Sequence, residues 1–302
     1  MTKKNPLVSI IMNCFNGEKY LPEALQSVLD QRYINWEIIF WDNQSTDSSV
    51  KIFKSYNEKR FIYFYAMEHT SLYKARNLAI EKSNGDFISF LDVDDAWEKD
   101  KLEIQMSYFD SLEVGVVFSN LWLVKRDLRK KKIYTNKKLP SGNIFNELID
   151  NYNVGILTTV IRKKFFLQIK KKFDERFSII GDFDLFLRLS KLCRFVGIQK
   201  PLAFYRLHGK NLSTLNQEKE IKEYEIWLDE NKLILDYSQI KKIKKKVNNS
   251  KFLHFKIEGK YKECINILLN SKIDLYNIKN LFLFFTPIIL LKKLMWFYND
   301  FK

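Results

Sequence analysis

The chain has few cysteines, no internal repeat and no low-complexity linker. Its three cysteines, Cys14, Cys193 and Cys264, lie far apart and form neither a CxxC pair nor a Cys/His cluster. This spacing indicates neither a disulfide framework nor a zinc site. A reducing compartment is therefore expected.

Long apolar runs are also missing. The longest, residues 281–291, is shorter than the roughly 20 residues that a bilayer-spanning helix needs. Lysines and aromatic residues follow it, so the segment 281–298 either lies in a membrane interface or packs as a buried terminal helix. Near the start, residues 7–12 are apolar but too short for a signal peptide and have no small-residue cleavage site. We expect them to form the first β-strand.

Positive charge is abundant. Lys and Arg number 51 against 36 Asp and Glu, which gives a net charge of +15 over 302 residues, 46% of them hydrophobic. A chain of this size buries a sizeable core. The excess gathers in the runs 129–132, 170–172 and 241–246. Nucleic acid, an anionic membrane surface and phosphorylated substrates all suit this charge, which does not choose among them.

The first third of the chain alternates between two hydrophobic patterns. Runs rich in Ile, Phe and Val predict strands, and segments with apolar residues at helical spacing follow them. The expected strands are 7–12, 36–41, 61–66 and 86–91; the expected helices are 21–29, one capped by Ser45 or Thr46, and 71–83. This alternation predicts a largely parallel sheet covered on both faces.

Three carboxylates, Asp92, Asp94 and Asp95, follow the fourth strand. Like charges this close need a metal or basic side chains, and oxygen ligands favour Mg²⁺ or Mn²⁺. The alternative is a solvated turn with a helix cap. Asn13–Asn16 and Asp42 also fall at strand ends. Because ligands bind at the carboxyl edge of such sheets, convergence of these segments favours a binding site.

The rest of the chain divides into two parts. We expect a helix at 98–112, strands at 114–124, 155–161, 194–198 and 202–205, a loop or hairpin at 125–138, and a helix at 182–192. From 211 the character changes to an amphipathic segment, 217–235, followed by the cationic run. The predicted domains are 1–210 and 211–302, the second helical and basic.

The chain contains six motifs whose order along the sequence resembles that of the family 2 glycosyltransferases, over roughly residues 7–210. They are Val8–Asn16, Glu37–Asp47, Lys74–Asn77, Asp92–Asp95, Gly181–Leu185 and Tyr205–His208. The resemblance implies an α/β, Rossmann-like GT-A fold, with a mostly parallel central sheet flanked by helices and a helical C-terminal extension. It also implies a nucleotide-sugar-dependent enzyme.

The resemblance assigns roles residue by residue. Nucleotide-sugar binding falls on Cys14, Phe15, Asn16, Asp42, Arg76, Asp92 and Val93. Phe15 and Asp42 would hold the nucleoside and Asp92 the ribose. Asp94, within a DXD motif, and His208 would hold Mn²⁺ or Mg²⁺. Asp95 is either a second ligand or a helix cap.

The implied reaction is inverting transfer of a sugar from a nucleoside diphosphate to an acceptor hydroxyl. The family's base matches Asp182, and Asp184 is a second candidate. Gly181 stands where the family usually has a glutamate. Asn13 and Cys14 replace the usual proline and threonine, and Asn43-Gln44 replaces Asp-Gly.

The partners expected are a UDP- or dTDP-linked donor and an acceptor in lipopolysaccharide, capsule or a lipid-linked glycan. We expect the protein in the cytoplasm, peripheral on the inner face of the membrane. A glycosidase fits less well because its two carboxylates must flank one bond. Nucleic-acid binding is disfavoured by acids at three strand ends, and Gly181 is the one hint of an inactive membrane-surface protein. The sequence specifies no oligomeric state.

Overall fold

The computed structural model describes residues 5–125, 128–208, 217–270 and 275–287. The chain forms two compact units, Met1–Arg206 and Leu207–Lys302, and each is described by itself.

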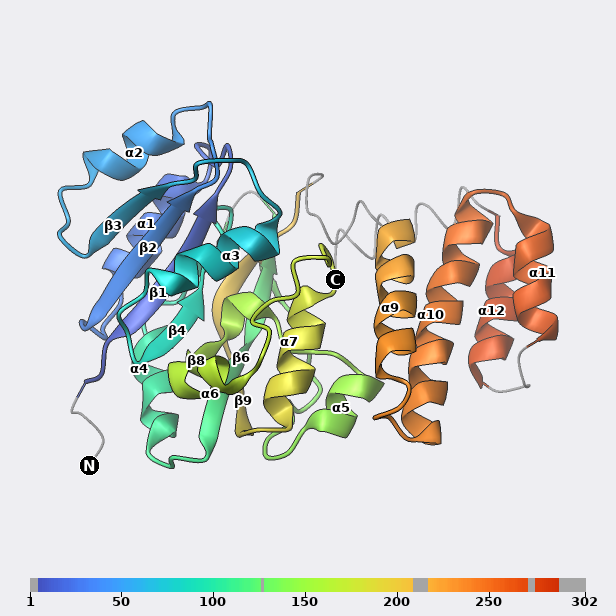
Figure 1. The fold of residues 1–302 in the computed structure, drawn as a ribbon. Helices are drawn as coiled ribbons and strands as arrows, with labels where there is room; N and C mark the ends of the chain where they lie inside the picture. Colours follow the sequence, from blue (N-terminus) through green and yellow to red (C-terminus); the bar gives the residue numbers. More distant parts are fainter. Residues whose placement is uncertain (1–4, 126–127, 209–216, 271–274, 288–302) are drawn as a thin grey trace. The chain divides into compact units, whose positions relative to one another are not determined.

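The first half of the first unit is a parallel sheet in the order β3-β2-β1-β4. Its strands are β1 (Val8–Cys14), β2 (Trp36–Asp42), β3 (Phe61–Tyr65) and β4 (Phe87–Phe90). The helices between them are α1 (Leu21–Leu29), α2 (Ser49–Ser55) and α3 (Leu72–Glu81). Every residue of β1, β2 and β4 is buried, as their dense apolar runs predict. In Figure 1 these strands lie side by side, with α3 packed on β1 and β2.

The second half extends the sheet in the order β4-β8-β6-β9-β5. The strands are β5 (Ala96–Trp97), β6 (Val114–Val124), β7 (Lys131–Ile133), β8 (Val160–Arg162) and β9 (Arg194–Arg206). β8 is antiparallel to both β4 and β6, β9 is parallel to β6, and β7 forms a hairpin with β6. Since β6 and β9 run in the same direction as β1–β4, their carboxyl ends reach the same edge of the sheet.

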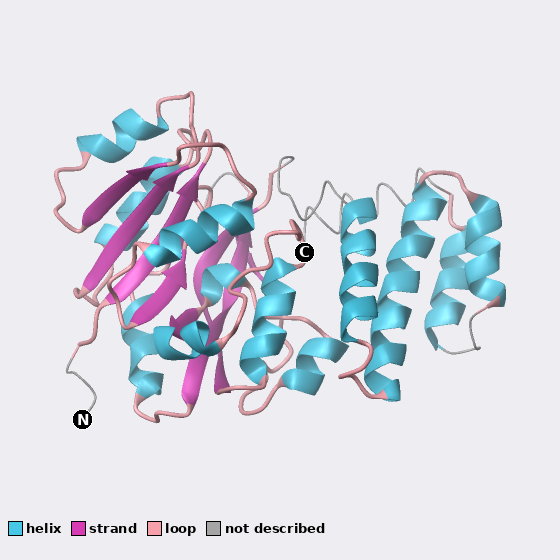
Figure 2. Ribbon diagram, viewed as in Figure 1, coloured by secondary structure: helices cyan, strands magenta, loops and turns pink. Residues whose placement is uncertain are grey.

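Short helices connect these strands, and Figure 2 shows helices on both faces of the sheet. They are α4 (Lys101–Met106), η1 (Ser107–Phe109), α5 (Phe145–Asp150), η2 (Ile156–Thr158), α6 (Lys163–Gln168) and α7 (Gly181–Ser190). The expected α/β architecture is therefore confirmed.

Several expected boundaries are wrong. The segment 155–161, expected as a strand, begins as η2, because the hydroxyls of Thr158 and Thr159 donate to the carbonyls of Gly155 and Ile156. The two strands expected at 194–198 and 202–205 are one strand, β9, with register shifts against β6. The helix α2 begins after Ser48, because Ser45 and Thr46 bond instead to the neighbouring loops.

The second unit contains α9 (Gln217–Asn231), α10 (Tyr237–Ile257), α11 (Tyr261–Leu269) and α12 (Leu275–Phe285). Asp236 and Gln239 form a capping box at the start of α10. Within the described ranges, no helix is both long and apolar enough to cross a membrane. Phe282 and Phe285 are exposed, and the part of the predicted interfacial segment beyond residue 287 lies outside the described residues.

Candidate active site

The loops after β1 and β2 are bonded to one another. The Asn43 N–H donates to the Cys14 carbonyl at 2.8 Å, and the Thr46 N–H donates to the Asn16 side-chain oxygen at 2.8 Å. Asn16 has a φ of 56°, a left-handed conformation that asparagine tolerates better than most residues. The two strand-end segments predicted to converge therefore form one surface.

Asp42, the predicted nucleoside ligand, is fully buried. One of its oxygens accepts from the Ser45 N–H at 2.8 Å and the other from the Tyr63 hydroxyl at 2.8 Å. Burial, together with this bond to Asp42, raises the pKa of Tyr63. Burial also raises the pKa of the Cys14 thiol, whose sulfur lies 3.6 Å from the Ser45 hydroxyl. Asp42 and Cys14 thus stabilise the loop that carries the site.

Phe15, in the loop after β1, has 52% of its surface exposed to solvent. Its ring packs edge-on against His69, with 4.5 Å between the ring centroids. His69 Nδ1 lies 2.9 Å from the Asn43 carbonyl oxygen, and the Asn43 side chain accepts from the Thr70 N–H. The unusual Asn43-Gln44 pair therefore holds the segment between β3 and α3, because Gln44 donates to the Met67 carbonyl.

The acidic turn after β4 closes on this surface. A Cβ atom at Gly17 would lie 2.6 Å from Val93 Cγ2. The loop after β1 therefore lies so close to the acidic turn that only glycine fits at position 17. Arg76, from α3, donates to both oxygens of Asp92 at 2.7 and 3.0 Å. Burial lowers the pKa of Arg76, but the negative charge of Asp92 and the other groups nearby outweigh that effect and leave the pKa raised. The predicted basic partner of the acidic cluster is therefore Arg76.

Asp95 faces inward and does not cap α4. Its carboxylate is buried and accepts a hydrogen bond from the Arg206 N–H at 2.8 Å. The residue at the N-terminus of α4 is Asp100 instead. Burial, followed by the charges of Asp94 and Asp92, raises the pKa of Asp95 well above its usual range. The Arg206 Nε–H also donates to the Asp94 carbonyl at 2.8 Å. Arg206 thus fixes the backbone of the turn.

Asp94 is half-buried at the same turn. Among the described residues, no three His, Cys, Asp or Glu side chains are grouped to hold a metal ion. Mg²⁺ and Mn²⁺ are often bound through one or two carboxylates and the phosphates of a substrate, so the oxygen donors of Asp94 fit a site that a diphosphate completes. His208 belongs to the second unit, and its position relative to this turn is not defined.

Asp182 lies in the first turn of α7 and is half-buried. Its carboxylate accepts from the Phe183 N–H at 2.9 Å, and the Tyr73 hydroxyl lies 3.5 Å away. Burial raises the pKa of Asp182, although a hydrogen bond from Tyr152 and the positive charge of Arg76 counteract it. An aspartate with a raised pKa suits proton abstraction.

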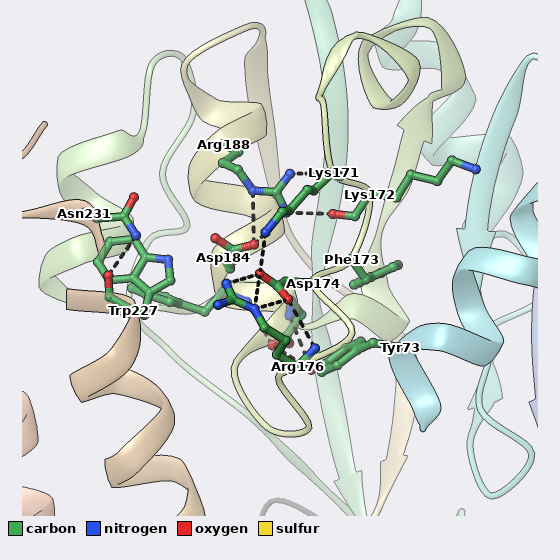
Figure 3. A network of polar contacts seen from close by, with 12 residues as sticks. Tyr73, Lys171, Lys172, Phe173, Asp174, Arg176, Asp184, Arg188, Trp227 and Asn231 are labelled. Carbon is green, nitrogen blue, oxygen red and sulfur yellow. Dashed lines mark hydrogen bonds and ion pairs between the residues drawn. The ribbon is translucent and has the colours of Figure 1, made fainter. Parts of the chain in front are cut away.

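Asp184, the second candidate base, is paired with Arg188 one turn along α7, at 2.6 Å. Figure 3 shows this pair beside a second one, Asp174 with Arg176. Arg188 also donates to the Lys172 carbonyl at 2.7 Å. Asp184 therefore anchors the segment that precedes α7, which leaves Asp182 as the candidate base.

Comparison with known proteins places this site in a family. The model of Glycosyl transferase family 2 matches residues 9–188, more than half of the chain. The chain belongs to this family. It is therefore a glycosyltransferase, and the matched region contains the acidic turn and Asp182.

Two relatives and one solved structure extend this result. TuaG of Bacillus subtilis, named for teichuronic acid biosynthesis, is 31% identical over 71% of this chain and 84% of its own length. The UDP-Glc:alpha-D-GlcNAc-diphosphoundecaprenol beta-1,3-glucosyltransferase WfgD of Escherichia coli is 29% identical over 72% of this chain and 83% of its own. The mannosyltransferase PcManGT from Pyrobaculum calidifontis, solved with GDP-Man and Mn²⁺, has a TM-score of 0.61 at 13% identity, over 92% of this chain and 79% of its own. The shared fold is the GT-A fold.

Several of the predicted site residues lie close together. The structure brings together the loops of Phe15, Asp42 and Asp92, and it sets Asp182 within the influence of Arg76. Sequence reasoning missed Tyr73, Tyr152 and His69. For Tyr73 a signal existed, since it precedes Arg76 by three residues and so shares its face of α3.

Proposed function

We propose that this glycosyltransferase transfers a sugar, with inversion, from a UDP- or dTDP-linked donor to an acceptor hydroxyl in the synthesis of a cell-surface polysaccharide, a lipopolysaccharide or a lipid-linked glycan. The observation that carries the proposal is the meeting of Arg76, Asp92 and Asp182 at one sheet edge. The names of TuaG and WfgD support the class of product, and that of WfgD supports a UDP-linked donor and a lipid-linked acceptor.

The donor binds across the loops after β1, β2 and β4. Phe15 lies against the nucleobase, because it is the exposed aromatic side chain of the first loop. The loop is shaped by Cys14, Asn16 and Asp42. In this proposal Asp42 also contacts the nucleobase. Asp92 and Val93 bind the ribose side of the donor. Arg76 is held close to the diphosphate by its pairing with Asp92.

In this proposal Asp94 would hold Mn²⁺ or Mg²⁺, with His208 as the second ligand expected from the family resemblance. The Mn²⁺ with which PcManGT was solved supports a divalent ion. Such an ion supplies Lewis-acid stabilisation of the negative charge that develops on the leaving diphosphate. Arg76 adds fixed positive charge on the same side. Arg206 keeps the Asp94 backbone in place for this role.

Asp182 takes the proton from the acceptor hydroxyl. Burial raises its pKa, which brings the carboxylate closer to the pH at which a general base is most effective. The positive charge of Arg76 opposes this effect and favours the ionised carboxylate.

The site of action is the inner face of the cytoplasmic membrane. A net charge of +15 favours an anionic lipid surface, and the acceptor named for WfgD is lipid-linked. The carboxylates around the site argue against nucleic acid as the partner.

The test is transfer or hydrolysis of a panel of nucleotide sugars with Mn²⁺ or Mg²⁺. We expect Asp182→Asn to lower kcat at least about 100-fold, because a general base contributes roughly 10²–10⁴-fold. We expect Asp94→Asn to lower kcat at least about 10-fold and to raise the Mn²⁺ concentration needed for half-maximal rate. Asp110→Asn, an exposed change on η1's C-terminal side, serves as the control. Full activity of both site variants would refute the assignment.

A further inference from the structure

Gly181, at the start of α7, has no room for a side chain. A Cβ atom there would lie 2.5 Å from Tyr73 Cε2 and 2.7 Å from Cδ2 and Cζ, closer than real Cβ contacts allow. The Tyr73 ring is itself fixed, because it stacks on Phe173 with 5.1 Å between centroids and 16° between planes. The space that a side chain at 181 would occupy is therefore filled by Tyr73.

The Tyr73 hydroxyl lies at the N-terminus of α7. The Asp182 N–H donates to it at 3.3 Å, and it donates to the Ile179 carbonyl at 3.2 Å. Amides in the first turn of a helix have no intrahelical acceptor, so the hydroxyl satisfies one that would otherwise need another partner. It connects the residue that carries the candidate base to the segment entering the helix.

The same side chain also faces the donor side of the site. Arg76 follows Tyr73 by one helical turn, and its guanidinium carbon lies 5.7 Å from the Tyr73 ring centroid. Arg76 in turn donates to Asp92. Tyr73 therefore lies between the cation assigned to the diphosphate and the carboxylate assigned to the acceptor.

We propose that Tyr73 is a positioning residue for Asp182, holding the base through its hydroxyl while Gly181 leaves room for its ring. This inference rests on the proposed function. A tyrosine that served only to fill space would need its ring and not its hydroxyl. Tyr73→Phe keeps the ring and removes the hydroxyl, so it separates the two roles.

For Tyr73→Phe we expect kcat to fall about 10-fold while the KM for the nucleotide sugar changes less than about 2-fold, because the base is displaced and the donor loops are not. We also expect the Asp182 amide to exchange with solvent at least about 10-fold faster, measured by NMR and assigned by comparison with Asp182→Asn. The amide measurement requires no substrate.

The matched control is Tyr33→Phe, which also removes a tyrosine hydroxyl that donates to a backbone carbonyl, that of Pro6. Tyr33 lies at the opposite, amino-terminal side of β1. We expect this variant to leave both kcat and Asp182 amide exchange unchanged. Equal effects of the two variants would reduce Tyr73 to a general stabilising role and overturn the proposal.

A second pair of variants tests the role of Gly181. We expect Gly181→Ala to lower kcat because the added methyl displaces the ring, and we expect Tyr73→Ala with Gly181→Ala to be no worse than Tyr73→Ala alone. Strictly additive losses would overturn the shared-space argument. A wild-type protein that turns over no donor overturns the proposed function itself. Turnover with an unaffected Tyr73→Phe overturns only this inference.

Discussion

At the scale of single residues, the pKa of Asp182 reflects two opposing effects: burial raises it, and neighbouring groups lower it in part. The Phe183 N–H donates to its carboxylate, and Tyr152 and Arg76 both favour the charged form, yet burial outweighs these effects and raises the pKa of Asp182. The unfolded chain therefore loses this proton at a lower pH than the folded protein does. Over the interval between the two pKa values, the folded state binds more protons and loses stability as the pH rises.

This direction of the pH dependence of stability gives a prediction that can be tested without substrate. Asp182→Asn removes the titration, so we expect its free energy of unfolding, relative to the wild type, to increase between pH 4 and pH 7. Urea midpoints at several pH values measure the difference, and any constant effect of the lost carboxylate bonds cancels between them. A difference that stays flat or declines over this range would contradict the raised pKa.

Residues at strand ends were predictable, and their partners were not. Asp92, Asp94 and Phe15 follow apolar runs that indicate buried strands, and parallel strands bring such ends together. Tyr73 lies 109 positions from Asp182, so no local pattern links them. The structural use of Asp42 was likewise hidden, because its partner Tyr63 comes from the neighbouring strand β3.

At the scale of elements, the end of β9 holds the acidic turn to α1. Arg206, fully buried, donates to the Asp94 carbonyl and forms an ion pair with Glu23 of α1. Its guanidinium also lies 4.3 Å from the Tyr20 ring centroid. One side chain therefore connects the last strand of the first unit to its first helix.

We expect Arg206→Met to lower the free energy of unfolding by about 3 kcal/mol, because it removes the charged hydrogen bonds that the buried guanidinium donates to the Asp94 carbonyl and to Glu23. Arg194→Met is the matched control on the same strand. Arg194 pairs with Glu113 at the surface, where both side chains are more than half exposed, and such a pair contributes at most about 1 kcal/mol. Urea unfolding measures both, and equal losses would contradict the role given to Arg206.

The sequence predicted which elements exist better than where they end. β6 has the expected limits, Val114–Val124, because its apolar run is continuous. The strand predicted at 155–161 is wrong in its first part, which forms η2. There the hydroxyls of two threonines donate to backbone carbonyls three residues earlier, and these local bonds compete with strand pairing. Within the run 125–138, expected as a loop or hairpin, Lys131–Ile133 forms β7 and pairs with Trp122–Val124.

At the scale of the whole molecule, the charge of +15 is carried in part by α10, which contains the run 241–246. Ile243 and Val247 are buried, while Lys241, Lys242 and Lys244 are exposed. A basic surface of this kind binds anionic lipid with an energy of about 1 kcal/mol per lysine near the surface.

We therefore expect the protein to bind vesicles containing phosphatidylglycerol at low salt and to dissociate at about 0.5 M NaCl, since salt screens exposed charges. Deleting 281–302 should weaken binding if that segment lies in the interface. Lys241→Glu with Lys242→Glu should weaken it independently. Sedimentation with vesicles measures this, and equal binding to neutral phosphatidylcholine would contradict an electrostatic contribution.

Arg206 also has a consequence for the order in which the chain acquires its structure. β1–β4 pair among themselves within the first ninety residues, whereas Arg206 meets Asp94 across 112 positions. Chains emerge from the ribosome N-terminus first, and contacts between distant positions form late. A nascent chain that ends before β9 thus contains the acidic residues without the arginine that holds them. The contacts of Arg206 with the acidic turn therefore form only after translation has passed residue 206.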